Sequence, residues 1–405
     1  MKLSASQLLI SLGLCGIATR ATPTARSSTE RSSTSWTTEN GTKCTKFSLV
    51  VPVNATNLIL EGPRVDSSFD AVTYAWDGDT WSSANATERI KGTISVNTAF
   101  NIAAQLCIPS SGGKSDILQI ATHGNSFDKR YWDAEVEPEN YNYIRAATNA
   151  GYSIFTYDRL SVGGSDKPDA YDIVQAPVEL EILRGVTEMA RSGDISRLAA
   201  RQIDTVLPDF TKFVHVGHSY GSILTSGLLA KYPDLTDGSI LTGFIINPHG
   251  PQYQLGVRGY QLASEAFPEE FGHLGSGYIC PGAKYNLHNS FFGGGDFDPK
   301  ILDYGWKIKQ PSTVGEGRSA IALLGLTAHN YTKPLQFFLA EFDAPVCNGD
   351  CKEAYNLTQI RETIYPNNPV VEVHIQPKTA HGFTLHRNAT GGYEEMFRFF
   401  GRNGL

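Results

Sequence analysis

Two stretches near the beginning of the chain alternate apolar and polar residues or are rich in β-branched residues. They are residues 46–52 and 92–98, and turn-forming Asn, Gly and Asp residues lie between them. Alternation with a period of two places the apolar side chains on one face of a strand. The region from Cys44 to Pro109 is therefore predicted to form β-strands.

A different pattern follows, in which short apolar runs alternate with segments of helical periodicity such as residues 178–190. The runs are residues 117–121, 152–157, 213–216, 243–246, 335–339 and 370–375. Runs that are apolar throughout are typical of parallel strands buried on both faces. We therefore expect an α/β fold, with helices on both faces of a mostly parallel sheet and reactive residues just after the carboxyl ends of its strands.

The alternation stops between residues 247 and 333, where no strand is evident and aromatic residues and glycine are frequent. A segment of this length is usually functional, so we expect a cap of helices and loops inserted over the site. The core then comprises residues 44–246 and 334–405. Five cap aromatics are candidates for contacting an apolar or aromatic group of a substrate, although such residues more often form a cap's own core. They are Tyr278, Phe291, Phe292, Tyr304 and Trp306.

The first residues predict a targeting signal. Lys2 precedes an apolar run from Leu8 to Ala18, and small residues follow it. This pattern is typical of a secretory signal peptide, here residues 1–21, and a buried N-terminal helix is the alternative. Residues 22–43 are rich in Ser, Thr and Arg and predict a flexible leader. No other apolar stretch is long enough for a membrane span, so we expect a secreted, soluble protein without stable membrane insertion.

Charge and glycosylation signals agree with that prediction. The formal net charge is −7 and the isoelectric point is near 5.8, which argues against nucleic acid as a partner. Asn-x-Ser/Thr triplets, the acceptor sequence for N-glycans in exported proteins, occur six times. The asparagines are Asn40, Asn54, Asn85, Asn330, Asn356 and Asn388.

Five cysteines lie beyond the predicted signal peptide. Cys347 and Cys351 bracket a turn sequence that would bring their sulfurs together, so we expect a disulfide between them. A metal site is the alternative, but no histidine or second cysteine pair lies at ligand spacing. We expect Cys44 to pair with Cys107, which leaves Cys280 unpaired.

The clearest candidate for chemistry is Ser219, in the pattern Gly217-His-Ser-Tyr-Gly221. This G-x-S-x-G pattern places a nucleophilic serine on a tight strand-to-helix turn, in which the glycines provide space. A β-branched run precedes it, and residues 222–232 have helical spacing that ends before Pro233. We therefore predict that Ser219 is a nucleophile.

A serine nucleophile requires a histidine to take its proton and an acid to orient the histidine. Asp343 follows a predicted strand, and His381 lies in a loop after the last one, which gives the chain order Ser, Asp, His. The competing acids and histidines are Glu341, Asp350, His374 and His386. Asn247, at the end of the preceding predicted strand, has no carboxylate to offer.

The reaction also needs N–H donors for the oxyanion of the tetrahedral intermediate. The backbone N–H of Tyr220 is one candidate because it follows the nucleophile. The other is expected in residues 123–126, after the run that ends at Ala121, and the N–H of Asn125 is favoured. An ordinary turn is the alternative interpretation of these residues.

Together, His123-Gly124, residues 158–165, the Ser219 motif, Asp343 and His381-Gly382 resemble the α/β-hydrolase superfamily, in particular secreted fungal-type serine hydrolases. The resemblance covers about residue 90 to the end, apart from the cap. It implies an eight-stranded sheet with an N-terminal β extension, a cap between strands six and seven, a Ser-His-Asp triad and no cofactor. Residues 158–165 resemble the family's loop after its fourth strand, which is usually structural. Their glycines match neither a P-loop nor a dinucleotide fingerprint.

The leading functional prediction is hydrolysis of a small-molecule carboxylic ester through an acyl-enzyme. Amide cleavage, as in aminopeptidase relatives, would require cap acids to hold an amine, and Glu265, Glu269 and Glu270 are the candidates. Biosynthetic chemistry on a secondary metabolite (lactone hydrolysis, cyclisation or rearrangement) is a further alternative, because a fold does not settle the reaction. A non-catalytic binding protein is the last alternative, and an intact triad argues against it.

Overall fold

The computed structural model describes residues 35–80, 88–111, 113–203, 205–246 and 254–405. The predicted signal peptide, most of the predicted leader, the triplet at Asn85 and the first residues of the predicted cap, Asn247 among them, lie outside the described residues. The described residues of the insertion belong to the same compact unit as the sheet.

The main sheet has nine strands in the order β1-β2-β3-β5-β4-β6-β7-β11-β12. Three strands pair antiparallel at one edge: β1 (Ser35–Thr37), β2 (Lys43–Leu60) and β3 (Ile90–Ile108). Six strands are parallel: β4 (Lys114–Thr122), β5 (Tyr152–Tyr157), β6 (Lys212–His218), β7 (Gly238–Thr242), β11 (Leu335–Phe342) and β12 (Val371–Ala380). The predicted fold class is confirmed.

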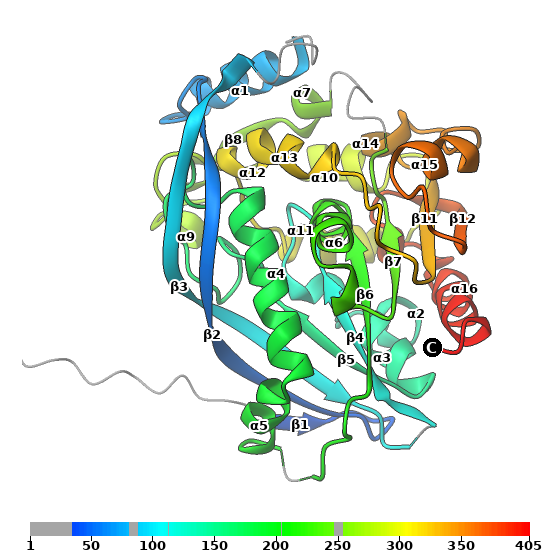
Figure 1. Ribbon diagram of the computed structural model, residues 1–405. Helices are drawn as coiled ribbons and strands as arrows, with labels where there is room; N and C mark the ends of the chain where they lie inside the picture. Colours follow the sequence, from blue (N-terminus) through cyan, green and yellow to red (C-terminus); the bar gives the residue numbers. More distant parts are fainter. Residues whose placement is uncertain (1–34, 81–87, 112, 204, 247–253) are drawn as a thin grey trace, which may run out of the picture. The chain divides into compact units, whose positions relative to one another are not determined.

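Helices cover both faces of this sheet. Outside the insertion they are α1 (Ser68–Thr80), α2 (Pro138–Tyr141), α3 (Tyr143–Asn149), α4 (Ala176–Arg191), α5 (Asp194–Ala200), α6 (Tyr220–Lys231), α14 (Ala344–Cys347), α15 (Leu357–Thr363) and α16 (Ala389–Arg402). Short 3-10 turns are η2 (Lys129–Tyr131), η3 (Pro233–Leu235) and η4 (Phe383–Leu385). Figure 1 shows α4 and α6 on one face, and β2 and β3 as a long curved hairpin with α1 at its far end.

Neighbouring residues of the parallel strands pack into two different cores. Phe213 and Leu241 join a cluster with residues of α4 and α6, whereas Val214 and Ile240 join a cluster with residues of α3 and α16. Side chains alternate between the two faces along each strand, so both neighbours must be apolar. This is why these strands appear in the sequence as continuous apolar runs.

The predicted number of eight strands was wrong by one. The additional strand β1 lies in the predicted leader, and Trp36 there pairs with Cys44 of β2. The Trp36 ring is half-buried, and Lys46 Nζ lies 4.9 Å from its centroid. One aromatic residue gives this Ser/Thr-rich segment enough contact to add a strand at the sheet edge.

The strand predicted over residues 243–246 was placed too late in the chain, because β7 spans Gly238–Thr242 and ends before the predicted strand begins. Gly243 has φ +56°, a left-handed conformation that turns the chain out of the sheet. The β7 residues Gly-Ser-Ile-Leu-Thr are less hydrophobic than Gly-Phe-Ile-Ile at 243–246, so hydrophobicity alone favoured the later window.

The insertion also differs from its prediction as helices and loops. It contains a three-stranded antiparallel sheet of β8 (Tyr260–Leu262), β9 (Tyr278–Pro281) and β10 (Ser312–Thr313). Its helices are α7 (Gln254–Arg258), α8 (Ala263–Ala266), α9 (Pro268–Phe271), α10 (Lys284–Phe291), α11 (Pro299–Lys307), α12 (Val314–Ser319) and α13 (Ile321–Leu324). Strands of two to four residues are too short to produce a recognisable period.

The cysteines pair as we predicted: Cys44 with Cys107 and Cys347 with Cys351. Cys44 and Cys107 lie opposite each other in the β2–β3 ladder. Cys280 is buried and unpaired among the described residues.

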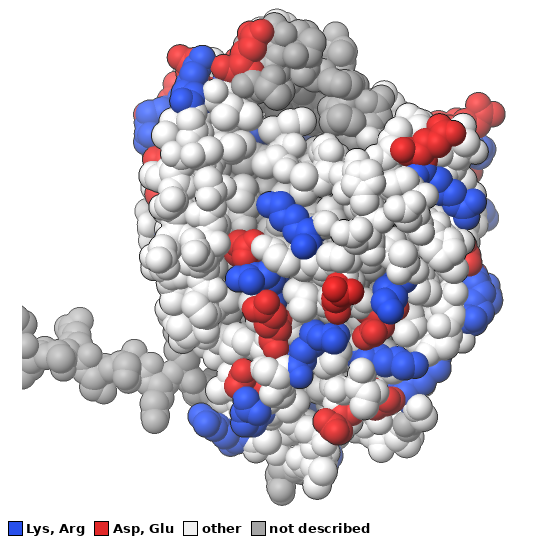
Figure 2. All heavy atoms as spheres, in the orientation of Figure 1, with Lys and Arg blue, Asp and Glu red and all other residues white. Residues whose placement is uncertain are grey.

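The surface offers no broad area of one charge sign on the face drawn in Figure 2, where acidic and basic side chains are interspersed. Within the described residues, no helix is both long and apolar enough to cross a membrane.

Candidate active site

Ser219 lies at the junction between β6 and α6, as the sequence pattern predicts. Its backbone has φ 54° and ψ −118°, a conformation that L-residues rarely adopt. A Cβ at Gly217 would lie 2.6 Å from Ser222 Cα, and one at Gly221 would lie 2.3 Å from Thr122 O. The two glycines are therefore required for the close packing of the turn that presents Ser219.

The three predicted triad residues lie within hydrogen-bond distance of one another. His381 Nε2 is 2.9 Å from Ser219 Oγ, and His381 Nδ1 is 2.8 Å from Asp343 Oδ2. His381 and Asp343 are buried. Because a carboxylate only accepts hydrogen bonds, Nδ1 carries the ring proton and Nε2 is left to accept the proton of Ser219.

The Asp343 carboxylate is held by both of its oxygens. Its Oδ1 accepts a hydrogen bond of 3.0 Å from Val346 N and caps α14, while Oδ2 faces His381. A Cβ at Gly243 would lie 3.1 Å from His381 Cε1 and 3.3 Å from Asp343 Oδ2. The end of β7 therefore supplies space for the Asp-His pair rather than a second acid.

The competing acids and histidines have other partners. Glu341 Oε2 accepts from Lys378 N, and Asp350 Oδ1 accepts from Lys352 N. His374 Nε2 is bonded to Gln376, and both ring nitrogens of His386 are bonded to backbone groups. None of the four is bonded to Ser219 or His381.

The loop after β4 lies against the nucleophile. A Cβ at Gly124 would lie 2.7 Å from Ser219 Cβ. His123 Nε2 accepts from Arg159 N at 3.0 Å, so its Nδ1 carries the proton donated to Gly124 O at 2.8 Å. Burial, and then the Arg159 charge, lower the pKa of His123 well below its ordinary value. The loop is therefore fixed by a neutral histidine rather than being an ordinary exposed turn.

The two predicted oxyanion donors are close to this junction. Tyr220 is the first residue of α6, where backbone N–H groups have no acceptor inside the helix. Within the described part of the chain, neither the Tyr220 N–H nor the Asn125 N–H donates a hydrogen bond. Both groups therefore remain candidates for binding the oxyanion.

A sequence model of the alpha/beta hydrolase family matches residues 120–386, which include Ser219, Asp343 and His381. The chain belongs to the alpha/beta hydrolase family. A search of curated proteins found no match.

Solved structures similar to this alpha/beta hydrolase include a thermophilic esterase from Thermogutta terrifontis, with 16% identity and a TM-score of 0.47 over 74% of this chain and 94% of that one. A putative aryl esterase from Burkholderia cenocepacia has 16% identity and a TM-score of 0.48 over 75% and 95%. The alpha/beta hydrolase GrgF from Penicillium sp. sh18 has 13% identity and a TM-score of 0.48 over 75% and 94%.

Sequence reasoning did not assign a role at the site to Arg159, which follows β5. Its guanidinium is 1% exposed and forms ion pairs with Glu179 Oε1 at 2.6 Å and Glu316 Oε1 at 2.5 Å. It also donates to Asn125 Oδ1 at 2.9 Å and lies 4.6 Å from the centroid of the Tyr220 ring. The signal available in the sequence was a pair of charged residues, Asp158 and Arg159, after an apolar strand.

Of the five cap aromatics, Phe291 is the one whose ring contacts a triad residue in the structure. Its ring centroid is 5.2 Å from that of His381, and its carbonyl accepts from Gly382 N at 2.9 Å. The other four have contacts elsewhere: Tyr278 with Pro168, Phe292 with His386, Tyr304 with Arg130 and Trp306 with Phe267. The insertion in this alpha/beta hydrolase reaches the site through α10.

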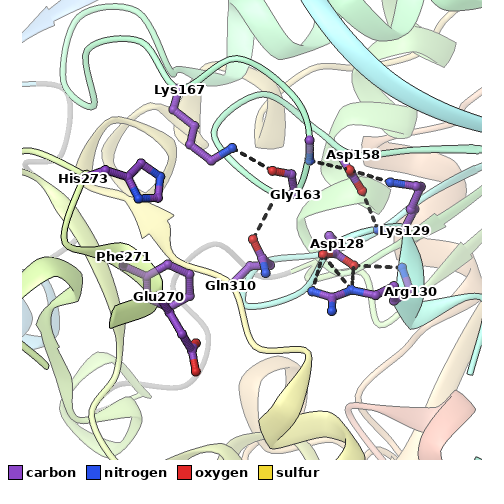
Figure 3. Close-up of a pocket in the computed structure, with 11 residues that line it drawn as sticks. Asp128, Lys129, Arg130, Asp158, Gly163, Lys167, Glu270, Phe271, His273 and Gln310 are labelled. Carbon is purple, nitrogen blue, oxygen red and sulfur yellow. Dashed lines mark hydrogen bonds and ion pairs between the residues drawn. The ribbon is translucent and has the colours of Figure 1, made fainter. Parts of the chain in front are cut away.

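A separate hollow of about 410 Å³ has a charged lining, shown in Figure 3. Asp158 Oδ2 accepts from Lys129 Nζ at 2.6 Å, and Asp128 pairs with Arg130. No triad residue lines this hollow. Among the described residues, no cluster of three or more His, Cys, Asp or Glu side chains is placed to hold a metal ion.

Proposed function

We propose that this alpha/beta hydrolase cleaves a carboxylic ester of a small molecule through an acyl-enzyme on Ser219. The observation that carries the proposal is the unbroken chain of hydrogen bonds from Ser219 Oγ through His381 to Asp343, at 2.9 and 2.8 Å. This arrangement allows a hydroxyl to lose its proton as it attacks a carbonyl.

In the first half of the reaction, Ser219 Oγ bonds to the ester carbonyl carbon while its proton passes to His381 Nε2. Asp343 stabilises the imidazolium that forms. The carbonyl oxygen becomes an oxyanion, which the N–H groups of Tyr220 and Asn125 receive. The tetrahedral intermediate then releases the alcohol, which takes its proton from His381.

In the second half, water attacks the acyl-enzyme and gives its proton to His381. The same two N–H groups hold the second oxyanion. Collapse of this intermediate breaks the bond to Ser219 Oγ, which regains the proton from His381, and the carboxylic acid leaves. The cycle requires no group beyond the residues of this chain and water.

Partners of the cap acids favour an ester over an amide with a free amine. Glu265 Oε2 accepts from Ser68 N at 2.8 Å, and Glu270 pairs with Lys309 at 2.8 Å. Two of the three candidate acids are thus occupied. The Phe291 ring beside His381 is buried and belongs to the core that supports the triad.

Export is also part of this proposal. Two disulfides and sequons at the exposed residues Asn54, Asn330 and Asn356 support it, because both features belong to oxidising, secretory environments.

The decisive experiment compares the wild-type chain with Ser219→Ala. The wild type is expected to hydrolyse a short p-nitrophenyl ester and to be labelled at Ser219 by a fluorophosphonate, and the variant is expected to do neither. Mass spectrometry of the labelled peptide identifies the modified residue. Undiminished turnover by Ser219→Ala would contradict the assignment of Ser219 as the nucleophile. A folded wild type that is not labelled would favour a binding protein.

A further inference from the structure

The buried guanidinium of Arg159 contacts the side chains of both residues whose backbone N–H groups are the proposed oxyanion donors. Its Nη2 donates to Asn125 Oδ1 at 2.9 Å. Its face lies over the Tyr220 ring, with the guanidinium carbon 4.6 Å from the centroid. Asn125 and Tyr220 come from different segments, the loop after β4 and the start of α6, and Arg159 joins them.

Arg159 is itself held in place by three elements. Nη1 lies between Glu179 of α4 and Glu316 of α12, at 2.6 and 2.5 Å. Its backbone N–H donates to His123 Nε2, which belongs to the same loop as Asn125. Glu316 is fixed in turn, because its Oε2 accepts from Thr313 N in a capping box. The guanidinium cannot move without breaking two buried hydrogen bonds to acidic side chains.

A purely structural role does not account for this arrangement. Burying a guanidinium beside two acidic side chains adds little net stability compared with apolar packing. Oxyanion stabilisation, in contrast, depends on donors that are in position before the charge develops. Arg159 directs an Nη2 hydrogen bond at Asn125 and its planar face at Tyr220, rather than binding a third acid.

We propose that Arg159 is a positioning residue that fixes both oxyanion donors and connects them, through Glu316, to the insertion. The proposal rests on ester hydrolysis at Ser219. Arg159 does not touch the reacting atoms. It acts by holding Asn125 and Tyr220 where the oxyanion forms.

The test measures kcat, KM and the affinity for an alkyl boronic acid, which forms a tetrahedral adduct on a nucleophilic serine. In Arg159→Gln we expect kcat to fall about 10- to 100-fold and KM to change by less than about threefold. Boronate affinity is expected to fall by the same factor as kcat/KM. Arg159→Lys retains the charge but not the planar fork, so it is expected to lose kcat as well.

Asn125→Ala keeps the backbone donor and removes only the acceptor of Arg159 Nη2, so it tests the same link if Arg159→Gln does not fold. We expect a smaller loss of kcat, and the double variant is expected to lose less than the product of the single losses. Leu49→Ala, in the buried part of β2, is the matched control for stability. It should lower Tm and leave the kcat and boronate affinity of the folded protein unchanged.

Unchanged kcat in folded Arg159→Gln, or a loss explained by the unfolded fraction as in Leu49→Ala, would overturn the role of Arg159. If Arg159→Gln does not fold, unchanged kcat and boronate affinity in Asn125→Ala would do the same. Fluorophosphonate labelling of the wild type separates the two proposals. A labelled wild type with an unaffected Arg159 variant contradicts only the positioning role, whereas an unlabelled wild type contradicts the hydrolase itself.

Discussion

Single side chains at this site have their roles limited by the partners they already have. One oxygen of Asp343 accepts a hydrogen bond from Val346 N and the other accepts one from His381, so Asp343 orients the imidazole ring. Glu341, two residues earlier, accepts a hydrogen bond from Lys378 N with one oxygen. Its other oxygen lies 3.4 Å from Lys352 Nζ. The choice between these two acids is thus made by hydrogen bonding rather than by distance along the chain.

This difference predicts the outcome of two conservative substitutions. Asp343→Asn should lower kcat on a p-nitrophenyl ester by about 10⁴-fold, because an amide would favour the wrong tautomer of His381. Glu341→Gln should change kcat by less than about threefold. Steady-state kinetics on both folded variants checks the pair, and a larger loss in Glu341→Gln would mean that the acid is misassigned.

How much of the site the sequence could predict depends on how local the signal is. Ser219 stands in a five-residue pattern, and Asp343 and His381 follow apolar runs, so their strand-end positions are visible in the sequence. Arg159 also follows such a run, but its significance comes from Asn125, Glu179 and Glu316, which lie in three other segments. Nothing local indicates that these segments meet.

Among the structural elements, α4 both covers the sheet and places Glu179 in contact with Arg159. Burial, opposed by Arg159 and reinforced by Glu316, raises the pKa of Glu179 to about 8. In the unfolded chain this carboxyl has its ordinary pKa near 4.5. The folded state therefore binds the proton of Glu179 more tightly than the unfolded state does.

Because the folded state binds this proton more tightly, the free energy of unfolding depends on pH. The contribution of protonated Glu179 is fully present below about pH 4.5 and is lost as the pH rises through about 8. The wild type should therefore show a lower Tm at pH 9 than at pH 6, and Glu179→Gln should show a smaller decrease. Calorimetry with Glu188→Gln, an exposed acid on the same helix, provides the control. Equal decreases in all three proteins would contradict the assignment.

The elements that the sequence predicted well are those with a strong period. Five of the six parallel strands overlap their predicted runs, and α4 and α6 follow their apolar spacing. β7 was predicted at the wrong position because the left-handed turn at Gly243 ends the strand while the sequence remains apolar beyond it. β1 and the small sheet of the insertion depend on contacts with distant partners, for which a short segment carries no signal.

For the molecule as a whole, the proposed export would bring the exposed asparagines of its Asn-x-Ser/Thr triplets into contact with the glycosylation machinery. Asn54, Asn330 and Asn356 are exposed, whereas the Nδ2 groups of Asn40 and Asn388 donate to Asn149 and Pro377. An Nδ2 that carries a glycan has to leave such a bond.

We therefore expect higher glycan occupancy at Asn54, Asn330 and Asn356 than at Asn388 in protein secreted from a eukaryotic host. Mass spectrometry of peptides after enzymatic removal of N-glycans in heavy-oxygen water measures the occupancy at each position. Complete occupancy at Asn388 together with bare exposed positions would contradict this expectation.

The capping box at Thr313 and Glu316 has a consequence for engineering. Chimeras that exchange the insertion for one from another hydrolase, in order to alter the range of substrates, would also remove one of the two carboxylates that brace Arg159. A graft that lacks an acid at position 316 would alter selectivity and turnover together. In this fold, the part that would be swapped for specificity also contacts the residue proposed to position the oxyanion donors.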